Sequence, residues 1–360
     1  MMASGIRVDA ESLERFASSL FQAAGVPLEE ADLVSSSLVG SNLRGHDSHG
    51  VVRIPRYLPL LDTGELVAAA DLVVQSETPA MICADAAFGF GMVQMTRLID
   101  RLDDKVDQLG VACGTLVRCG HVGRVGEWAE LVASRGRAAL VTVNDNGVLK
   151  CVAPPGGTEP TVSTNPIAIG VPTGDRPLVV DISTSVVANG KVLVQQVAGE
   201  ACPEGWLLDA RGEPTTDPAV RFTDPRGTIL PMGGYKGFGL SLLLDILVGG
   251  LSGGSCPPAS EGAPGTNNVL VVVWDPERFA GSGHFLGEAD KLIQFVRGVN
   301  RVPGVESIRL AGDRSNRMMA ERLAGGVPLD SGTWDSLCQT CLLYTAPSPR
   351  DGLLARMPAS

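Results

Sequence analysis

Segment 43–57, Leu43-Arg44-Gly45-His46-Asp47-Ser48-His49-Gly50-Val51-Val52-Arg53-Ile54-Pro55-Arg56-Tyr57, holds two of the four histidines of this 360-residue chain. An imidazole with a pKa of about 6.5 exchanges protons near neutral pH, and a guanidinium binds a carboxylate through two parallel hydrogen bonds. If the chain past Ser48 is helical, His49, Arg53 and Tyr57 recur every four residues and share one face. Pro55 argues against a long regular helix. The segment predicts a site where a small anionic ligand gains or loses a proton.

A second histidine stands between glycines in Cys119-Gly120-His121-Val122-Gly123-Arg124, directly after a predicted strand. Glycine lets a ligand approach the backbone closely, so His121 is a further acid/base candidate. Taken alone, this histidine is equally well explained as a turn residue in water, and segment 43–57 as a polar surface at a helix end.

Two more groups suit a cofactor that carries ribose and phosphate. The first runs from Thr164-Asn165-Pro166 to Asp181-Ile182-Ser183 and Asn189-Gly190-Lys191, with a carboxylate at a strand end and hydroxyls at a predicted helix start. The second is Gly233-Gly234-Tyr235-Lys236-Gly237-Phe238-Gly239, a glycine-rich loop with a lysine before an apolar helix. Helix capping and a tight turn explain each group without any ligand, so only their combination is informative.

Other kinds of chemistry remain open at this stage. The cluster His46, Asp47 and His49 would also serve a metal-dependent hydrolase or lyase, and a catalytically inactive binding homologue is a third alternative. The chain has no GxGxxG after a strand, no P-loop, no GxSxG and no HExxH. Cys338-Gln-Thr-Cys341 has CxxC spacing but no second pair, and the eight cysteines are expected to be free thiols.

The elements that position these groups alternate between strands and helices. Apolar stripes predict helices over 10–25 and from residue 27 onward, through 92–102, over 125–134 and over 240–247. Buried strands are predicted at 81–83, 111–113, 138–143, 166–171, 178–181 and 269–274. The helix over 125–134 lies between two such strands, and this βαβ-like alternation predicts an α/β fold.

Composition excludes several kinds of partner. With 29 Lys and Arg against 40 Asp and Glu, the net charge of −11 opposes binding to nucleic acid or to an anionic membrane. The N-terminus has no apolar signal core, and the apolar stretch 238–251 is interrupted by Asp245 and is short for a membrane span. We expect a soluble, cytoplasmic protein.

In this order, the groups resemble the type-2 malate/L-lactate dehydrogenase family, which includes ureidoglycolate, sulfolactate and diketogulonate oxidoreductases. The resemblance covers roughly residues 8–340. Its most specific parts are Leu43-Arg44-Gly45, Asp47-Ser48-His49-Gly50, Gly120-His121, Thr164-Asn165-Pro166, Asp181 to Lys191, Gly205-Trp206 with Pro214-Thr215-Thr216-Asp217-Pro218, and Gly234-Tyr235-Lys236-Gly237.

The resemblance implies an oxidoreductase that transfers a hydride between NAD or NADP and a small 2-hydroxy or 2-keto acid. It also implies an α/β nicotinamide-binding fold without the Rossmann fingerprint, a helical N-terminal segment and a homodimer. His49 and His121 would be the acid/base residues, and Arg53 would hold the substrate carboxylate with Ser48 and Tyr57 nearby. Residues implied along the cofactor are Asn144, Asn165, Asp181, Ile182, Ser183, Lys191, Lys236, Gly312 and Asp313.

The expected organisation has four parts. These are a helical, substrate-side segment over 1–110, a central α/β cofactor-binding domain over 111–300, a C-terminal helical segment over 301–341 that packs back on the N-terminal part, and a non-native or disordered tail over 342–360. The chain departs from the family at His46, in Asn144-Asp145-Asn146-Gly147 and in Ala311-Gly312-Asp313. These departures bear on the choice of substrate and on the last cofactor contact.

Overall fold

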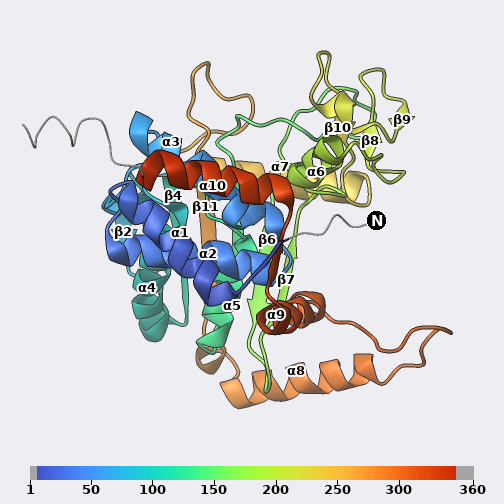
Figure 1. Cartoon of the computed structure of the whole chain (residues 1–360). Coiled ribbons are helices and arrows are strands. Elements are labelled where there is room, and N and C mark those ends of the chain that lie inside the picture. The colour runs from blue at the N-terminus through green and yellow to red at the C-terminus, as the bar shows by residue number, and fades with distance from the viewer. Residues whose placement is uncertain (1–5, 346–360) are drawn as a thin grey trace, which may run out of the picture. The chain divides into compact units, whose positions relative to one another are not determined.

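A mixed seven-stranded sheet organises the larger part of the chain, in the order β2-β3-β4-β11-β5-β6-β7. The computed structural model describes residues 6–345 (Figure 1). Its strands are β2 (Val73–Thr78), β3 (Met81–Asp85), β4 (Val111–Cys119), β5 (Ala138–Asn144), β6 (Ile167–Val171), β7 (Leu178–Ile182) and β11 (Asn267–Trp274). Every neighbouring pair is antiparallel except β3 and β4, which are parallel.

The βαβ-like alternation predicted from the sequence is present in split form. β4 and β5 are linked by α5 (Val125–Ser134) and run in the same direction, because each pairs antiparallel with β11 between them. Val269, Val271 and Val273 of β11 are fully buried, which explains the unbroken apolar run in this strand. The predicted α/β class is therefore confirmed, with a late strand inserted at its centre.

Three long helices cover this sheet. α4 (Gly91–Leu109) packs on β4 and β11, α5 packs on β5, β6 and β7, and α7 (Tyr235–Ser252) packs on β11, β5 and β4. By length and composition α7 is also sufficient to cross a membrane, so the expectation that this stretch is too short is wrong. Its contacts with three strands are those of a helix that covers a sheet.

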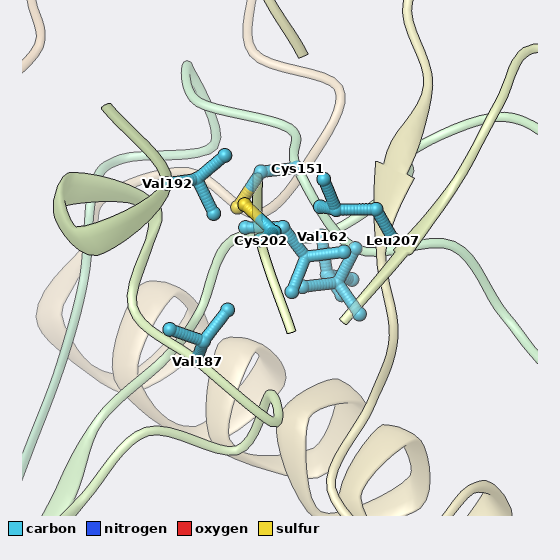
Figure 2. Packing of buried hydrophobic residues seen from close by; sticks show 8 residues of the cluster. Cys151, Val162, Val187, Val192, Cys202 and Leu207 are labelled. Carbon is cyan, nitrogen blue, oxygen red and sulfur yellow. The ribbon is translucent and has the colours of Figure 1, made fainter. Parts of the chain in front are cut away.

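A small lobe follows the sheet and contains α6 (Asn189–Ala198), β8 (Leu207–Leu208), β9 (Pro214–Thr215), the 3₁₀ turn η3 (Pro218–Arg221) and β10 (Thr228–Ile229). Figure 1 shows these elements gathered in yellow-green. Eight buried residues form its own hydrophobic cluster (Figure 2): Cys151, Val152, Val162, Val187, Val192, Cys202, Leu207 and Ile229. All eight cysteines of the chain are free thiols, as expected.

A second unit of the fold is mostly helical and combines both ends of the chain. It consists of the described residues up to Ala69 and those from Ser315 onward. Its elements are β1 (Ile6–Val8), α1 (Ala10–Ala23), α2 (Leu28–Leu43), the 3₁₀ turns η1 (Asp47–His49) and η2 (Val51–Arg53), α3 (Ile54–Thr63), α9 (Asp313–Gly325), β12 (Val327–Leu329) and α10 (Ser331–Thr345). β1 pairs with β12, and α10 packs on α1 and α3.

Two predicted boundaries differ from the structure. The larger unit begins at Ala70 rather than near residue 111, because β3 pairs with β4 and draws residues 70–110 into the sheet. It ends at Arg314, after the 3₁₀ turn η4 (Pro276–Arg278) and helix α8 (Ser282–Arg297). The predicted tail over 342–360 begins too early, since α10 continues through Thr345. The rest of that tail, 346–360, lies outside the described residues.

Candidate functional site

His49 lies in a pair of short 3₁₀ turns between α2 and α3. It ends η1, and Gly50 then adopts an extended backbone (φ −89°, ψ −155°) before η2 begins. Arg53 precedes the first residue of α3, and Tyr57 lies within that helix. The expectation of one continuous helical face for His49, Arg53 and Tyr57 is therefore wrong, because the chain changes direction at Gly50.

A polar clamp fixes the turn that carries His49. The guanidinium of Arg322 donates to both carboxylate oxygens of Asp47, from Nη1 at 2.6 Å and from Nη2 at 3.1 Å. Asn42 donates to Oδ1 of Asp47 at 2.8 Å and accepts from the backbone N–H of Val51 at 2.9 Å. A Cβ at Gly50 would overlap the Asn42 amide, so this position requires glycine.

Ser48 orients the imidazole of its neighbour. Its hydroxyl lies 3.0 Å from Nδ1 of His49, and when the hydroxyl oxygen accepts from Nδ1–H, Nε2 of the neutral imidazole is free to take up a proton. Nε of Arg53 donates to the backbone oxygen of Ser48 at 2.6 Å. One turn therefore holds a histidine, a hydroxyl within hydrogen-bond distance of its Nδ1 and an arginine that is tied to the same backbone.

Half-buried Arg53 and buried Tyr57 form an electrostatically coupled pair. Burial lowers the pKa of Arg53, and the neighbouring Tyr57 opposes that shift. Burial likewise raises the pKa of Tyr57, which is 4% exposed, and Arg53 opposes the rise. Removal from water makes the arginine a stronger partner for an anion that enters beside it, because hydration no longer competes.

The structure gives no support to a metal centre in this segment. Within residues 6–345, no group of three His, Cys, Asp or Glu side chains is arranged to hold a metal ion. Both oxygens of Asp47 are engaged by Arg322. His46 contributes backbone bonds to the turn, since its oxygen accepts from the N–H of His49 at 2.8 Å.

His121 lies in the loop between β4 and α5, in the other unit. Its Nδ1 accepts from the N–H of Gly123 at 3.3 Å. The next residue, Val122, donates its N–H to Oδ1 of Asn267 at 3.1 Å and accepts from the indole of Trp128 at 2.9 Å. The loop is therefore anchored directly after its half-buried histidine.

Asp181 ends up beside this loop. Its Oδ2 accepts from the N–H of Gly126 in the first turn of α5 at 2.9 Å and lies 4.0 Å from Nη1 of Arg124. A carboxylate at a helix N-terminus is stabilised by the unpaired amides and by the helix dipole. Asp181 thus caps α5. This bond connects the end of β7, which was predicted to contact ribose, to the helix that follows the His121 loop.

Three sequence-distant groups predicted for the cofactor are joined by backbone hydrogen bonds. The N–H of Thr184 donates to the oxygen of Thr164 at 2.9 Å, and the N–H of Met232 donates to the oxygen of Thr184 at 2.9 Å. These bonds place Thr164–Pro166, Asp181–Ser185 and the turn before α7 side by side. The resemblance named these groups from sequence alone. They meet because β6 pairs with β7 and because Ser185 and Pro231 form an isolated antiparallel β-bridge.

The turn before α7 combines two glycines that face open space with an exposed lysine. Gly233 and Gly234 have left-handed backbones (φ 60° and 65°), and a Cβ at either would meet nothing within 4 Å. Lys236 follows in the first, exposed turn of the helix. A cation beside uncapped helix amides fits an anion, while the hydroxyl of Ser183 and exposed Ile182 lie on the adjoining segment. This donor set fits a dinucleotide.

Two predicted cofactor residues have a different role. Asn144 (2% exposed) and Asn165 (fully buried) both donate to the carboxylate of Asp245, at 2.9 and 2.5 Å. Asn144 also accepts from Asn268 at 2.9 Å. These bonds make the two asparagines ties between the ends of β5 and β6 and helix α7. Both side chains are buried, and both amides are engaged with the carboxylate of Asp245.

The remaining predicted cofactor residues are more peripheral. Lys191 is exposed near the start of α6. Gly312 has a left-handed backbone (φ 85°), and Oδ2 of Asp313 accepts from the N–H of Leu310 at 2.8 Å. Asp313 also lines an open pocket of about 830 Å³ together with Arg297 and Arg301.

Sequence reasoning missed the residues that support the site. Arg322 and Asn267 give no motif, because their partners are distant in sequence. Asn42 bonds to nearby Asp47 and Val51, but its residue type alone did not mark it. Asp245 did give a signal: an acidic residue inside an apolar helix is expected to be paired when it is buried. Burial raises the pKa of this carboxyl, and the two asparagine amides oppose the rise.

Comparisons with known proteins agree with the resemblance predicted from the motifs. A sequence model of the malate/L-lactate dehydrogenase family matches residues 8–338. Hydroxycarboxylate dehydrogenase B of Escherichia coli K12 is 33% identical over 342 residues, which is 94% of this chain and 94% of that protein. L-sulfolactate dehydrogenase of Methanothermobacter thermautotrophicus is 30% identical over 330 residues, 90% of this chain and 93% of that protein.

A solved structure agrees in the same way. Malate dehydrogenase of Pyrococcus horikoshii superposes with a TM-score of 0.85 at 28% identity, covering 96% of this chain and 97% of that one. The predicted fold, including its helical N-terminal segment, is confirmed.

Proposed function

Because the chain belongs to the malate/L-lactate dehydrogenase family, we propose that it transfers a hydride reversibly between NAD or NADP and a small 2-hydroxy or 2-keto acid. The observation that carries this proposal is the turn of Ser48, His49 and Arg53. It holds an oriented imidazole and a half-buried guanidinium on one short stretch of backbone. A 2-keto acid presents a carbonyl and a carboxylate on adjacent carbons, and these two side chains match that pair.

The protein's share of the reaction is orientation and proton transfer. The nicotinamide, when bound, supplies the hydride. In the reduction direction, the His49 imidazolium donates a proton from Nε2 to the carbonyl oxygen as negative charge develops there, and in the oxidation direction the neutral imidazole takes the proton back at Nε2. The neutral imidazole keeps its other proton on Nδ1, where the hydroxyl oxygen of Ser48 accepts it. Arg53 fixes the carboxylate through two parallel hydrogen bonds and so decides which face of the carbonyl reacts.

The residues of the larger unit would hold the cofactor. Gly233, Gly234 and Lys236 suit its phosphates, and Asp181 with Ser183 suits ribose hydroxyls. His121 stands at the start of the same region and is the second acid/base candidate. Lys191 and the Gly312–Asp313 turn are proposed at its margins. We further propose a cytoplasmic homodimer.

Turnover with a panel of small 2-keto acids tests the proposal. Oxidation of NADH or NADPH is followed by its loss of near-ultraviolet absorbance, in parallel for the wild type, His49→Ala and His284→Ala. Removing a positioned acid/base residue lowers rates by roughly 10²- to 10⁴-fold, so His49→Ala should lose most of kcat while its affinity for the cofactor survives. His284 is exposed on α8, and its substitution should change neither quantity.

Two results would count against the proposal. If no 2-keto acid is turned over with either nicotinamide, the reaction class assigned here is wrong. If His49→Ala retains the wild-type kcat, the protonation role does not belong to His49.

A further inference from the structure

The loop that carries His121 is tied to a second loop, between β3 and α4, that no motif singled out. Both loops leave the carboxyl ends of the parallel strands β3 and β4, where open α/β sheets place their ligands. Three backbone hydrogen bonds join the second loop to the end of β4 and the His121 loop: Ala86 N–H to the oxygen of Val117, Phe88 N–H to that of Arg118 and Gly120 N–H to that of Gly89, at 2.9, 2.8 and 2.9 Å. A fourth bond, from Gly89 N–H to the oxygen of Ala86 at 2.7 Å, tightens the second loop itself.

An ion pair closes this junction. Asp85, the last residue of β3, is buried and accepts two hydrogen bonds from Nε of Arg118, at 3.0 and 3.1 Å, and another from Nη2. Oδ1 of Asp85 also accepts from the N–H of Ala87 at 2.8 Å. The guanidinium carbon of Arg118 lies 5.1 Å from the centroid of the Phe88 ring, within the range of a cation–π contact.

The backbone at the junction is held in an unfavourable conformation. Ala87, Phe88 and Arg118 have φ values of 48°, 61° and 50°, in the left-handed region that residues with a side chain rarely adopt. Such conformations persist where surrounding contacts enforce them and are concentrated at functional sites. Here the enforcing contacts are the Asp85–Arg118 pair and the bonds between the two loops, and the enforced segment ends three residues before His121.

Gly91, the first residue of α4, packs directly on the histidine. A Cβ at this position would lie 2.5 Å from both the carbonyl carbon and the oxygen of His121, and would also overlap the oxygen of Gly120. Backbone atoms cannot move aside as a flexible side chain does. Any residue other than glycine at position 91 would therefore displace His121.

From these contacts we propose that Asp85, Arg118 and Gly91 are positioning residues that set the place of the His121 imidazole in the active site. The proposal rests on the proposed function in that His121 belongs to that site. Asp85 and Arg118 fix the direction of the backbone at the end of β4. Gly91 allows the backbone of Gly120 and His121 to pack closely against the start of α4. None of the three is a catalytic residue, since each acts through His121.

Nuclear magnetic resonance of the imidazoles separates position from activity. With only four histidines in the chain, the His121 resonance is identified by comparison with His121→Gln. In Asp85→Asn and Gly91→Ala, the His121 resonance should shift or broaden, while those of His46, His49 and His284 stay in place. Since small misplacements of a reacting group cost up to about 10²-fold, kcat should fall roughly tenfold with a nearly unchanged KM for the cofactor.

Three further variants complete the design. Arg118→Ala should behave as Asp85→Asn does, and Arg118→Lys should restore part of kcat because it keeps the charge. Gly287→Ala is the control for Gly91→Ala, since a Cβ there meets nothing within 4 Å. Arg135→Ala is the control for the ion pair, because the guanidinium of Arg135 pairs with Asp100 and Asp103, which belong to α4 and to neither loop. Both controls should match the wild type.

The proposal is overturned if Asp85→Asn and Gly91→Ala, with melting temperatures near that of the wild type, leave the His121 resonance unchanged. A displaced His121 resonance with wild-type kcat would support the positioning role and would instead remove His121 from the proposed reaction. Loss of kcat in His121→Gln, together with a displaced His121 resonance in Asp85→Asn and Gly91→Ala, would support both the positioning role and the part of His121 in the reaction.

Discussion

Arg53 reports most directly on the substrate, because it is the residue proposed to bind the substrate carboxylate. It is half-buried at the start of α3, and its Nε bonds to the backbone oxygen of Ser48 at 2.6 Å. Its neighbour Arg56 is exposed. A guanidinium held in this way presents its remaining donors in a fixed plane, which matches a carboxylate.

We therefore expect Arg53→Lys to raise the KM for a 2-keto acid about tenfold to a hundredfold, because one of two charge-assisted hydrogen bonds is lost. The KM for the cofactor should not change. Steady-state kinetics with both substrates varied measures the two constants, and Arg56→Lys is the matched control. Equal KM values for all three proteins would show that Arg53 does not bind the carboxylate.

At the level of single residues, the sequence supplied candidates for the chemistry and little of their geometry. The types and order of His49, Arg53 and His121 were informative because proton transfer and anion binding need those side chains. Their supports were not visible, since Arg322 and Asn267 act on partners more than a hundred positions away. Asn144 and Asn165 matched a motif, yet their amides bond to buried Asp245.

At the level of elements, the end of β5 carries a second buried carboxylate close to Asp245. Burial raises the pKa of Asp145 from 3.8 to about 6, and the charge of Asp245 acts in the same direction. Its Oδ2 accepts from the N–H of Leu149 at 2.7 Å, whereas Oδ1 is buried and has no hydrogen-bond partner among the described residues. The carboxyl of Asp145 therefore holds its proton more strongly in the folded protein than in the unfolded chain.

The sign of the resulting pH dependence follows from linkage. Between pH 4 and 6, roughly, the folded state binds more protons at Asp145 than the unfolded state, so stability falls as pH rises, by about 2–3 kcal/mol in total. Asp145→Asn removes the charge, so the variant should be more stable than the wild type at pH 8, by about 2 kcal/mol, and the gain should vanish near pH 4.

Urea unfolding at both pH values measures this difference, with exposed Asp175→Asn as the control. A variant that is no more stable than the wild type at the higher pH would mean that Asp145 is not held as a buried acid.

Element prediction succeeded where the pattern is local. Helix 125–134 and the strand over 138–143 were placed from their apolar spacing alone. The position of β11 between β4 and β5 was not predictable in that way, because pairing depends on residues more than a hundred positions apart. The same reason explains the boundary at Ala70, which β3 sets by joining β4.

At the level of the whole molecule, apolar side chains remain exposed on one face of α7. Leu243 is 60% exposed and Ile246 is 52% exposed, and the same face includes Leu242, Leu247 and Leu251. Monomers rarely leave a contiguous apolar face of this kind in water, and a second copy of the chain would cover it in the proposed homodimer.

Sedimentation velocity should therefore give twice the mass of one chain. A single species with the mass of one chain at assay concentrations would contradict the homodimer.

The central claim is that a hydride passes directly between the nicotinamide and the carbon that bears the keto group. The most direct measurement supplies NADH or NADPH with deuterium on the transferable position, together with a 2-keto acid that is turned over, and examines the product by mass spectrometry. The account predicts one deuterium, bonded to the carbinol carbon of a single enantiomer of the 2-hydroxy acid. A product without deuterium would contradict it.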